Sequence, residues 1–332
     1  MFVNRALVVT CSIFMLSLPA RAEHQHHHHL HGKDTPFGIM GEHLMGENEW
    51  MLSYRLMRMM MDGNRDGTSR VATPLPGFMV SPLDMTMNMH MLGGMYGVND
   101  RLTLMLMLPA IDSDMNHVVN SGMMAGTLFN TAASALGDIS LTAITAINGR
   151  GTLINAGLSI PTGSIDERDV IPASAGVPVQ LPYPMQTGSG TWDLILGISQ
   201  IGHTQHFNWG AQAMSTLRLG SNDNGYTLGN LMQVTAWVSK PLNPTVSASL
   251  RLQAENRGNI DGADTTLSAT PTVPTKNPEL RGGSRIDVSA GINFTFSNHV
   301  LGLELGIPLY QYLDGPQLET DTVLTVGWQS SY

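Results

Sequence analysis

The chain is short of cysteine and of long apolar segments. Its 332 residues include one cysteine, Cys11, which lies in the N-terminal leader described below, so the mature chain has no thiol. A chain without thiols suits an oxidising envelope compartment. The longest apolar run covers residues 6–18, which is shorter than the roughly 20 residues that a transmembrane helix needs. The sequence therefore predicts no transmembrane helix.

Charged residues are also scarce. They make up 13% of the chain, whereas a soluble domain usually carries about 25%. The mean hydropathy is near zero although no long apolar block is present. A surface that faces lipid explains this shortage of charge, and a soluble two-domain enzyme does not. The net charge of −9 argues against nucleic acid as a partner.

The first residues have the features of a secretory signal peptide. Arg5 supplies a positive charge, the apolar run follows, and Ala20 and Ala22 offer small side chains at the cleavage site. We therefore expect residues 1–22 to be removed. This leader implies export out of the cytoplasm.

Apolar and small polar residues alternate in many segments of the chain, with residues 246–255 and 286–296 as the clearest cases. A period of two is typical of β-strands whose two faces meet different surroundings. A water-soluble β-sandwich would show the same alternation, so the pattern alone does not decide between a sandwich and a membrane barrel.

The connections between the expected strands distinguish these folds. Short turns alternate strictly with long segments rich in Gly, Pro, Asn and Asp, such as 111–137 and 161–191. Outer-membrane barrels have this arrangement, with turns in the periplasm and loops outside the cell. The expected strands lie at roughly 49–61, 83–96, 101–110, 138–147, 152–160, 192–201, 208–219, 229–240, 245–256, 284–297, 299–309 and 318–332.

The last strand ends in an aromatic residue, Tyr332, as the targeting signal of outer-membrane barrels does. We therefore predict an all-β fold, a single antiparallel up-and-down transmembrane β-barrel of about 12 strands in the bacterial outer membrane. Residues 1–22 form the signal peptide, 23–47 a flexible His-rich periplasmic segment and 48–332 the barrel, with both ends in the periplasm. The expected partners are outer-membrane lipid, the barrel-assembly machinery and a small solute or metal ion.

Histidine and methionine are unusually concentrated in a few places. Imidazole and thioether groups are ligands for soft or borderline metals such as copper, zinc and nickel. An artificial affinity tag and a solvated linker are alternative interpretations of the histidine tract. The tract comprises His24, His26, His27, His28, His29 and His31.

The alternation predicts which methionines line the interior. In the first strand Met57, Met59 and Met61 should point inward, and in the third strand Met105 and Met107 should do so. In the second strand the polar face with His90 should line the lumen, which sends Met85, Met87, Met89 and Met91 into lipid. A bulge at Gly93-Gly94 that switches the faces is an alternative. A flexible apolar filling of the barrel is the competing explanation for the inward methionines.

The sequence contains no recognisable catalytic arrangement and requires no cofactor. The leading interpretation is an outer-membrane channel or transporter for a small solute, with a soft metal ion such as copper first and small aromatic or apolar molecules second. A non-conducting envelope barrel that binds copper, zinc or nickel is another possibility. A hydrolase is a further one, and it would need a serine and a histidine together at the lipid-facing rim.

The segment 49–68 resembles a family of bacterial outer-membrane β-barrels, the phenol-degradation MetA-pathway or transporter proteins. The similarity continues through 87–91, 100–105 and 136–138. The resemblance implies a channel-like outer-membrane protein of poorly defined substrate, and it supplies no catalytic residues.

Overall fold

The computed structural model describes residues 32–147, 151–267 and 272–332. The signal peptide, the histidine tract from His24 to His31 and the expected turn at Asn148-Gly149 lie outside the described residues. Within these ranges eleven strand elements form a closed ring in which every neighbour is antiparallel. The ring consists of β1 (Trp50–Gly67), β3 (Val80–Asn99), β4 (Leu102–Val119), β6 (Ile139–Ile147), β7 (Thr152–Ile160), β10 (Trp192–His203), β11 (Asn208–Leu219), β13 (Leu231–Asn243), β14 (Val246–Arg257), β16 (Gly283–Phe296) and β17 (His299–Ser331).

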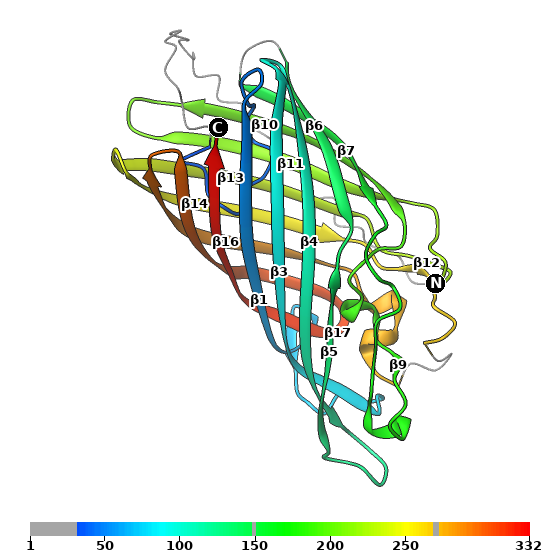
Figure 1. Cartoon of the computed structure of the whole chain (residues 1–332). Helices are drawn as coiled ribbons and strands as arrows, with labels where there is room; N and C mark the ends of the chain where they lie inside the picture. Colours follow the sequence, from blue (N-terminus) through cyan, green and yellow to red (C-terminus); the bar gives the residue numbers. More distant parts are fainter. Residues whose placement is uncertain (1–31, 148–150, 268–271) are drawn as a thin grey trace, which may run out of the picture.

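The ring closes between the last strand and the first, which lie side by side as the red and blue ribbons of Figure 1. The first part of β17 pairs with β16 up to Leu313, and its second part pairs with β1 from Leu313 onward. A closed ring in which all neighbours are antiparallel needs an even number of strand passes from one end of the barrel to the other. The ring has eleven strand elements, so the 33-residue β17 supplies two of the passes. The prediction of an antiparallel barrel with about 12 passes is confirmed.

Two short strands extend the sheet outside the ring, β2 (Ser69–Val71) and β5 (Leu128–Leu136). The remaining elements are the small strands β8 (Arg168–Asp169), β9 (Val179–Gln180), β12 (Tyr226–Thr227) and β15 (Asp261–Gly262), and the 3₁₀-helices η1 (Pro172–Ser174), η2 (Tyr183–Met185), η3 (Pro274–Lys276) and η4 (Pro278–Leu280). None of the helices in the described part of the chain is long and apolar enough to cross a bilayer.

The two faces of the wall differ as the alternation predicts. On β14 the side chain of Leu250 is 52% exposed on the outside, whereas Arg251 is 8% exposed and points inward. Pairing places the outward residues of neighbouring strands side by side, so they form one apolar outer surface. On β16 and β17 this surface includes Ile286, Phe294, Leu301, Leu303, Leu305 and Ile307.

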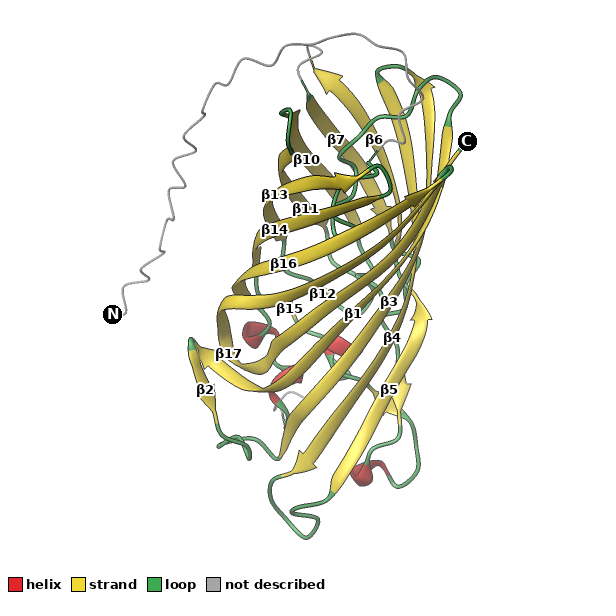
Figure 2. Cartoon of the chain, turned by 90° about the vertical axis from the view of Figure 1, so that its left-hand side faces the viewer, coloured by secondary structure: helices red, strands yellow, loops and turns green. Residues whose placement is uncertain are grey.

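The two ends of the barrel are unlike. Short turns and the C-terminus lie at one end, which we call the turn end, and long connections lie at the other, the loop end (Figure 1). At the loop end η2, β12 and their surroundings form an apolar cluster of Tyr183, Tyr226, Leu228, Ile260 and Leu267. Figure 2 shows the short red helices away from the C-terminus.

One expected loop is wrong. Within the expected loop 111–137, residues 111–119 continue β4 toward the loop end and residues 128–136 form β5, and the two strands pair from Ala110↔Leu136 to Val118↔Leu128. The strand pair therefore projects past the rest of the ring at the loop end, as Figure 2 shows for β3, β4 and β5. The outward polar residues of β4 and β5, including Asp112 and Asn130, hid this strand from a search for apolar alternation.

The expectation of a free N-terminal segment is also wrong for the residues that the structure describes. Residues 33–49, which we call the plug, enter the barrel at the turn end and contact strands around the ring, with Glu47 and Asn48 exposed at its rim. Phe37, Ile39 and Met45 are 3%, 2% and 1% exposed. These apolar side chains are too far apart to form a periodic pattern, yet each of them fills space in the lumen.

Candidate functional site: the barrel interior

Phe37 anchors the plug to the final strand. A methyl group added at Gly302 would lie 1.8 Å from the Phe37 ring, and one at Gly327 would lie 1.9 Å from it. The two glycines belong to the two passes of β17, so their missing side chains create the slot that the ring occupies. On another side the guanidinium of Arg55 lies 5.7 Å from the ring centroid, which is within the range of a cation–π contact.

Hydrogen bonds from the wall hold the backbone of the plug. The Gly38 amide donates to Glu304 Oε2 at 3.3 Å, and the Met45 amide donates to Thr103 Oγ1 at 2.8 Å. Gln212 Nε2 donates to the Met40 carbonyl at 2.9 Å. The side-chain amide of Asn293 donates to the carbonyls of Lys33 and Thr35. Donors and acceptors from β4, β11, β16 and β17 therefore fix one segment from several directions.

Little space remains between the plug and the wall. A cavity of about 10 Å³ lies between Glu42 and His43 of the plug and Arg55, Met105 and Met107 of the wall. This volume is near the lower limit for one water molecule. The Glu42 carboxylate and His43 Nδ1 are 2.8 Å apart and both residues are buried. A solute could pass this cavity only if the plug moved.

Methionine side chains line the inner face of β1, β3 and β4, a surface that we call the methionine wall. As predicted, Met57, Met59 and Met61 point inward from β1, and Met105 and Met107 are buried inside β4. The other members are Met51, Met85, Met87, Met89, Met91, Met95 and Met115.

The assignment of faces in β3 is wrong. Met85 is 2% exposed inside the barrel, whereas Leu92 and Tyr96 are 45% exposed outside. His90 is therefore on the outer face, and the Met85, Met87, Met89 and Met91 side chains line the lumen. The register from Met85 to Gly97 is uninterrupted, so Gly93-Gly94 does not form a bulge that switches the faces. Gly93 instead leaves room for Ser53 and Met107, since a methyl group there would lie within 3 Å of both.

The structure separates the candidate metal ligands. Met105 and Met107 pack in a cluster near the turn end with Met45 and Met95. Met61 packs in a different cluster near the loop end with Met85, Met115 and Met185, and Met57 and Met59 lie between the two clusters. Among the described residues, no group of three His, Cys, Asp or Glu side chains is arranged to hold a metal ion.

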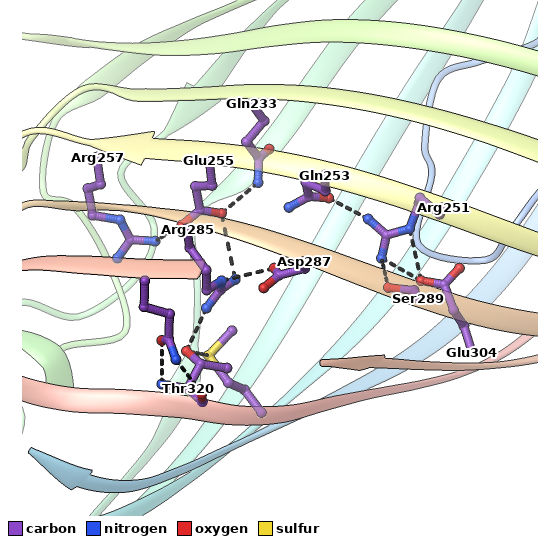
Figure 3. Close-up of polar contacts among 12 residues, drawn as sticks. Gln233, Arg251, Gln253, Glu255, Arg257, Arg285, Asp287, Ser289, Glu304 and Thr320 are labelled. Atoms are coloured by element: carbon purple, nitrogen blue, oxygen red, sulfur yellow. Dashed lines mark hydrogen bonds and ion pairs between the residues drawn. The ribbon is translucent and has the colours of Figure 1, made fainter. Parts of the chain in front are cut away.

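Charged residues also face the lumen on β14, β16 and β17, where Figure 3 shows them. Near the turn end, Arg251 Nε donates to Glu304 Oε1 at 2.9 Å, and both side chains are buried. Farther toward the loop end, Arg285 Nε donates to Asp287 Oδ2 at 2.9 Å, and Arg285 also lies 4.0 Å from Glu255. Arg257 Nη2 is 3.5 Å from Glu255.

Beyond the end of β14, Arg281 extends this row of guanidinium groups, and its Nη2 donates to Gln317 Oε1 at 3.1 Å. We call Arg251, Arg285, Arg257 and Arg281 the arginine ladder. None of its members was among the predicted site residues, although Arg251 and Arg285 fall on the inward parity of the expected strands at 245–256 and 284–297. Their inward position in the alternation was therefore the sequence signal that could have identified them as lining the lumen.

On the outer face, Tyr54, His90, Asp112 and Ser134 form a chain of contacts. The Tyr54 hydroxyl is 2.7 Å from His90 Nδ1, His90 Nε2 is 3.5 Å from Asp112 Oδ2, and the Ser134 hydroxyl donates to Asp112 Oδ1. Asp112 separates the histidine from the serine, so the histidine is not placed to accept the serine proton. This outward cluster therefore does not supply the nucleophile and base that the hydrolase alternative needs.

Comparison with known proteins supports the fold. No family model and no curated protein matches the chain. Among solved structures, the COG4313 outer membrane channel from Pseudomonas putida F1 is similar with a TM-score of 0.58 at 15% identity, over 88% of this chain and 98% of that chain. At this identity the similarity shows the fold alone, which is that of bacterial outer-membrane β-barrels.

Two other barrels are similar at lower scores. The toluene transporter TodX from P. putida has a TM-score of 0.41 at 9% identity, over 91% of this chain and 94% of that chain. A Pseudomonas aeruginosa FadL homologue has a TM-score of 0.40 at 11% identity, over 85% and 90% of the two chains. Since no family model matches, membership of the phenol-degradation family stays a prediction.

Proposed function

We propose that the chain is an outer-membrane channel for small apolar solutes, with its turn end in the periplasm. The observation that supports this function best is the methionine wall, which runs inside a closed barrel from the plug to the cluster at the loop end. Thioether side chains are flexible and apolar, so they can accommodate solutes of different shapes. Methionines packed inside a barrel could also form the core of a soluble protein. The outside of this barrel is apolar as well, which is the arrangement of a barrel that lies in a membrane.

The proposed channel is closed in this structure by the plug. At its end next to β1 the plug exchanges backbone hydrogen bonds with β3, from the Asn48 amide to the Gly97 carbonyl and from the Gly97 amide to the Glu49 carbonyl, both at 2.9 Å. The part of the plug before these residues forms no strand and is held by side-chain hydrogen bonds and by the Phe37 ring. This part of the plug can shift while the ring of strands remains intact, because the ring closes independently through β1 and β17. Displacement of the plug would open a path along the methionine wall.

The replacement Phe37→Ala tests this function in planar bilayers and liposomes. Loss of the ring from its slot should raise the mean open time of single channels and the uptake of benzyl alcohol, with folding and heat stability retained. Leu242→Ala, a change at an exposed residue near the end of β13, is the matched control. Absence of conductance and of solute uptake in both wild type and Phe37→Ala protein would contradict the proposed function.

A soft metal ion is the second candidate substrate, because Met57, Met59 and Met61 do line the lumen. We expect the tract from His24 to His31 to bind Cu(II), Ni or Zn with an affinity that falls below about pH 6 as imidazole becomes protonated. The methionines should bind Cu(I) with little dependence on pH. Unchanged copper binding in a His24–His31 deletion and in a Met57, Met59 and Met105 to Leu variant would exclude this candidate.

A further inference from the structure

We infer that the preferred substrate is a small organic anion with an apolar body, such as an aromatic carboxylate, and that Arg257 and Arg281 capture its charged group at the loop end. The inference rests on the proposed function and specifies the substrate class of the same lumen. It depends on two features of the interior: the ladder is least completely paired at one end, and it meets the methionine wall at Thr320.

The pairing of the ladder weakens from the turn end to the loop end. Arg251 forms a buried ion pair with Glu304 and a further hydrogen bond to Ser289 at 3.3 Å. Arg285 contacts Asp287 and shares Glu255 with Arg257. The Arg257 side chain is 57% exposed, and its contact with Glu255 is 3.5 Å long. The pairing of the ladder with carboxylates is therefore weakest at the loop end.

Arg281 has the least complete pairing of the ladder. Its Nη1 is buried and has no hydrogen-bond partner among the described residues, and its Nη2 contacts a neutral amide. Burial, and in second place the charge of Arg257, lower the pKa of the Arg281 guanidinium to about 10, so the group remains charged at neutral pH. A buried guanidinium donor without an acceptor is well placed to bind a carboxylate, which accepts hydrogen bonds through two oxygens.

The ladder and the methionine wall meet at Thr320. Arg285 Nη1 donates to Thr320 Oγ1 at 2.6 Å, and the same hydroxyl lies 3.9 Å from Met59 Sδ. Figure 3 shows this junction at the bottom of the row of charges. A solute in the lumen would therefore have guanidinium groups on one side and thioethers on the other. An anion with an apolar body matches both surfaces, whereas an inorganic anion matches only the ladder.

Competing fluxes of benzoate, benzyl alcohol and benzylamine into liposomes test the inference. We expect wild-type barrels to pass benzoate fastest, and the Arg257→Gln, Arg281→Gln double variant to lose about tenfold of the benzoate rate, the lower range of electrostatic steering. The benzyl alcohol rate should not change. Arg58→Gln removes one charge from the exposed outer face and should change neither rate. The corresponding double Lys variant should retain most of the benzoate rate.

Calorimetric binding of benzoate to the purified full chain in detergent separates this inference from the proposed function. The double Gln variant should raise the dissociation constant about tenfold, and heat stability reports whether the variants are folded. If no solute crosses the bilayer but benzoate binds through the two arginines, the channel function is wrong and the anion site stands. Unchanged benzoate flux and binding in the folded double variant, or an equal loss of benzyl alcohol flux, would overturn the inference.

Discussion

Leu250 and Gln233 lie on neighbouring strands and point to opposite sides of the wall. Leu250 is 52% exposed on the apolar outer surface, and Gln233 faces inward and donates to Glu255 at 2.9 Å. Leu250→Arg should lower the free energy of unfolding by roughly 2–4 kcal/mol, because it places a charge in lipid near mid-membrane. Gln233→Arg should be tolerated, since the new guanidinium would meet Glu255. Urea unfolding in lipid vesicles measures both changes, and equal destabilisation would contradict the assigned faces.

At the scale of elements, most of the strands could be predicted from the sequence. The expected strand at 152–160 coincides with β7, and that at 208–219 coincides with β11. These strands are recognisable because each has lipid outside and polar groups inside, which imposes a period of two. The strand β3 has apolar methionines inside and a polar outer face at its loop half, so its alternation is visible but its orientation is not.

The contents of the lumen were less predictable than its wall. The inward methionines of β1 and β4 followed from parity, but the plug has no period and depends on contacts with residues far away in sequence, such as Phe37 with Gly302. The pairing within the arginine ladder likewise joins different strands, for example Arg251 and Glu304. Such pairs depend on strand register around the ring, which a single sequence does not specify.

Tyr332, the residue after β17, contacts the start of β1 where the barrel closes. The Tyr332 ring stacks on Trp50 with centroids 4.3 Å apart, and the two backbones exchange hydrogen bonds at 3.0 and 2.8 Å. Deletion of Tyr332 should remove these contacts and lower the fraction of heat-resistant barrel on semi-native gels. Tyr312→Ala removes an exposed ring from the other part of β17 and serves as the control. Equal yields of deletion and wild-type barrel would contradict a role for Tyr332 in closure.

For the whole molecule, the orientation in the membrane is the principal prediction. A protease site inserted between Met123 and Met124 lies at the loop end, where Met123 is fully exposed, and a site between Ser297 and Asn298 lies at the turn end. If the turn end faces the periplasm, protease added to intact cells should cleave only the first site. Both sites should be cleaved after the outer membrane is permeabilised. Cleavage of the second site alone on intact cells would reverse the orientation.

The position of Phe37 has a consequence for the order of assembly. Its slot is formed by Gly302 and Gly327, which lie on successive passes of the last strand, and the second pass is held in place by β1. The slot is therefore complete only after the C-terminal residues have joined the wall. The N-terminal plug can therefore dock only after the C-terminal strand has paired with β1. Protection of Phe37 from solvent would report that the barrel of a newly made chain has closed.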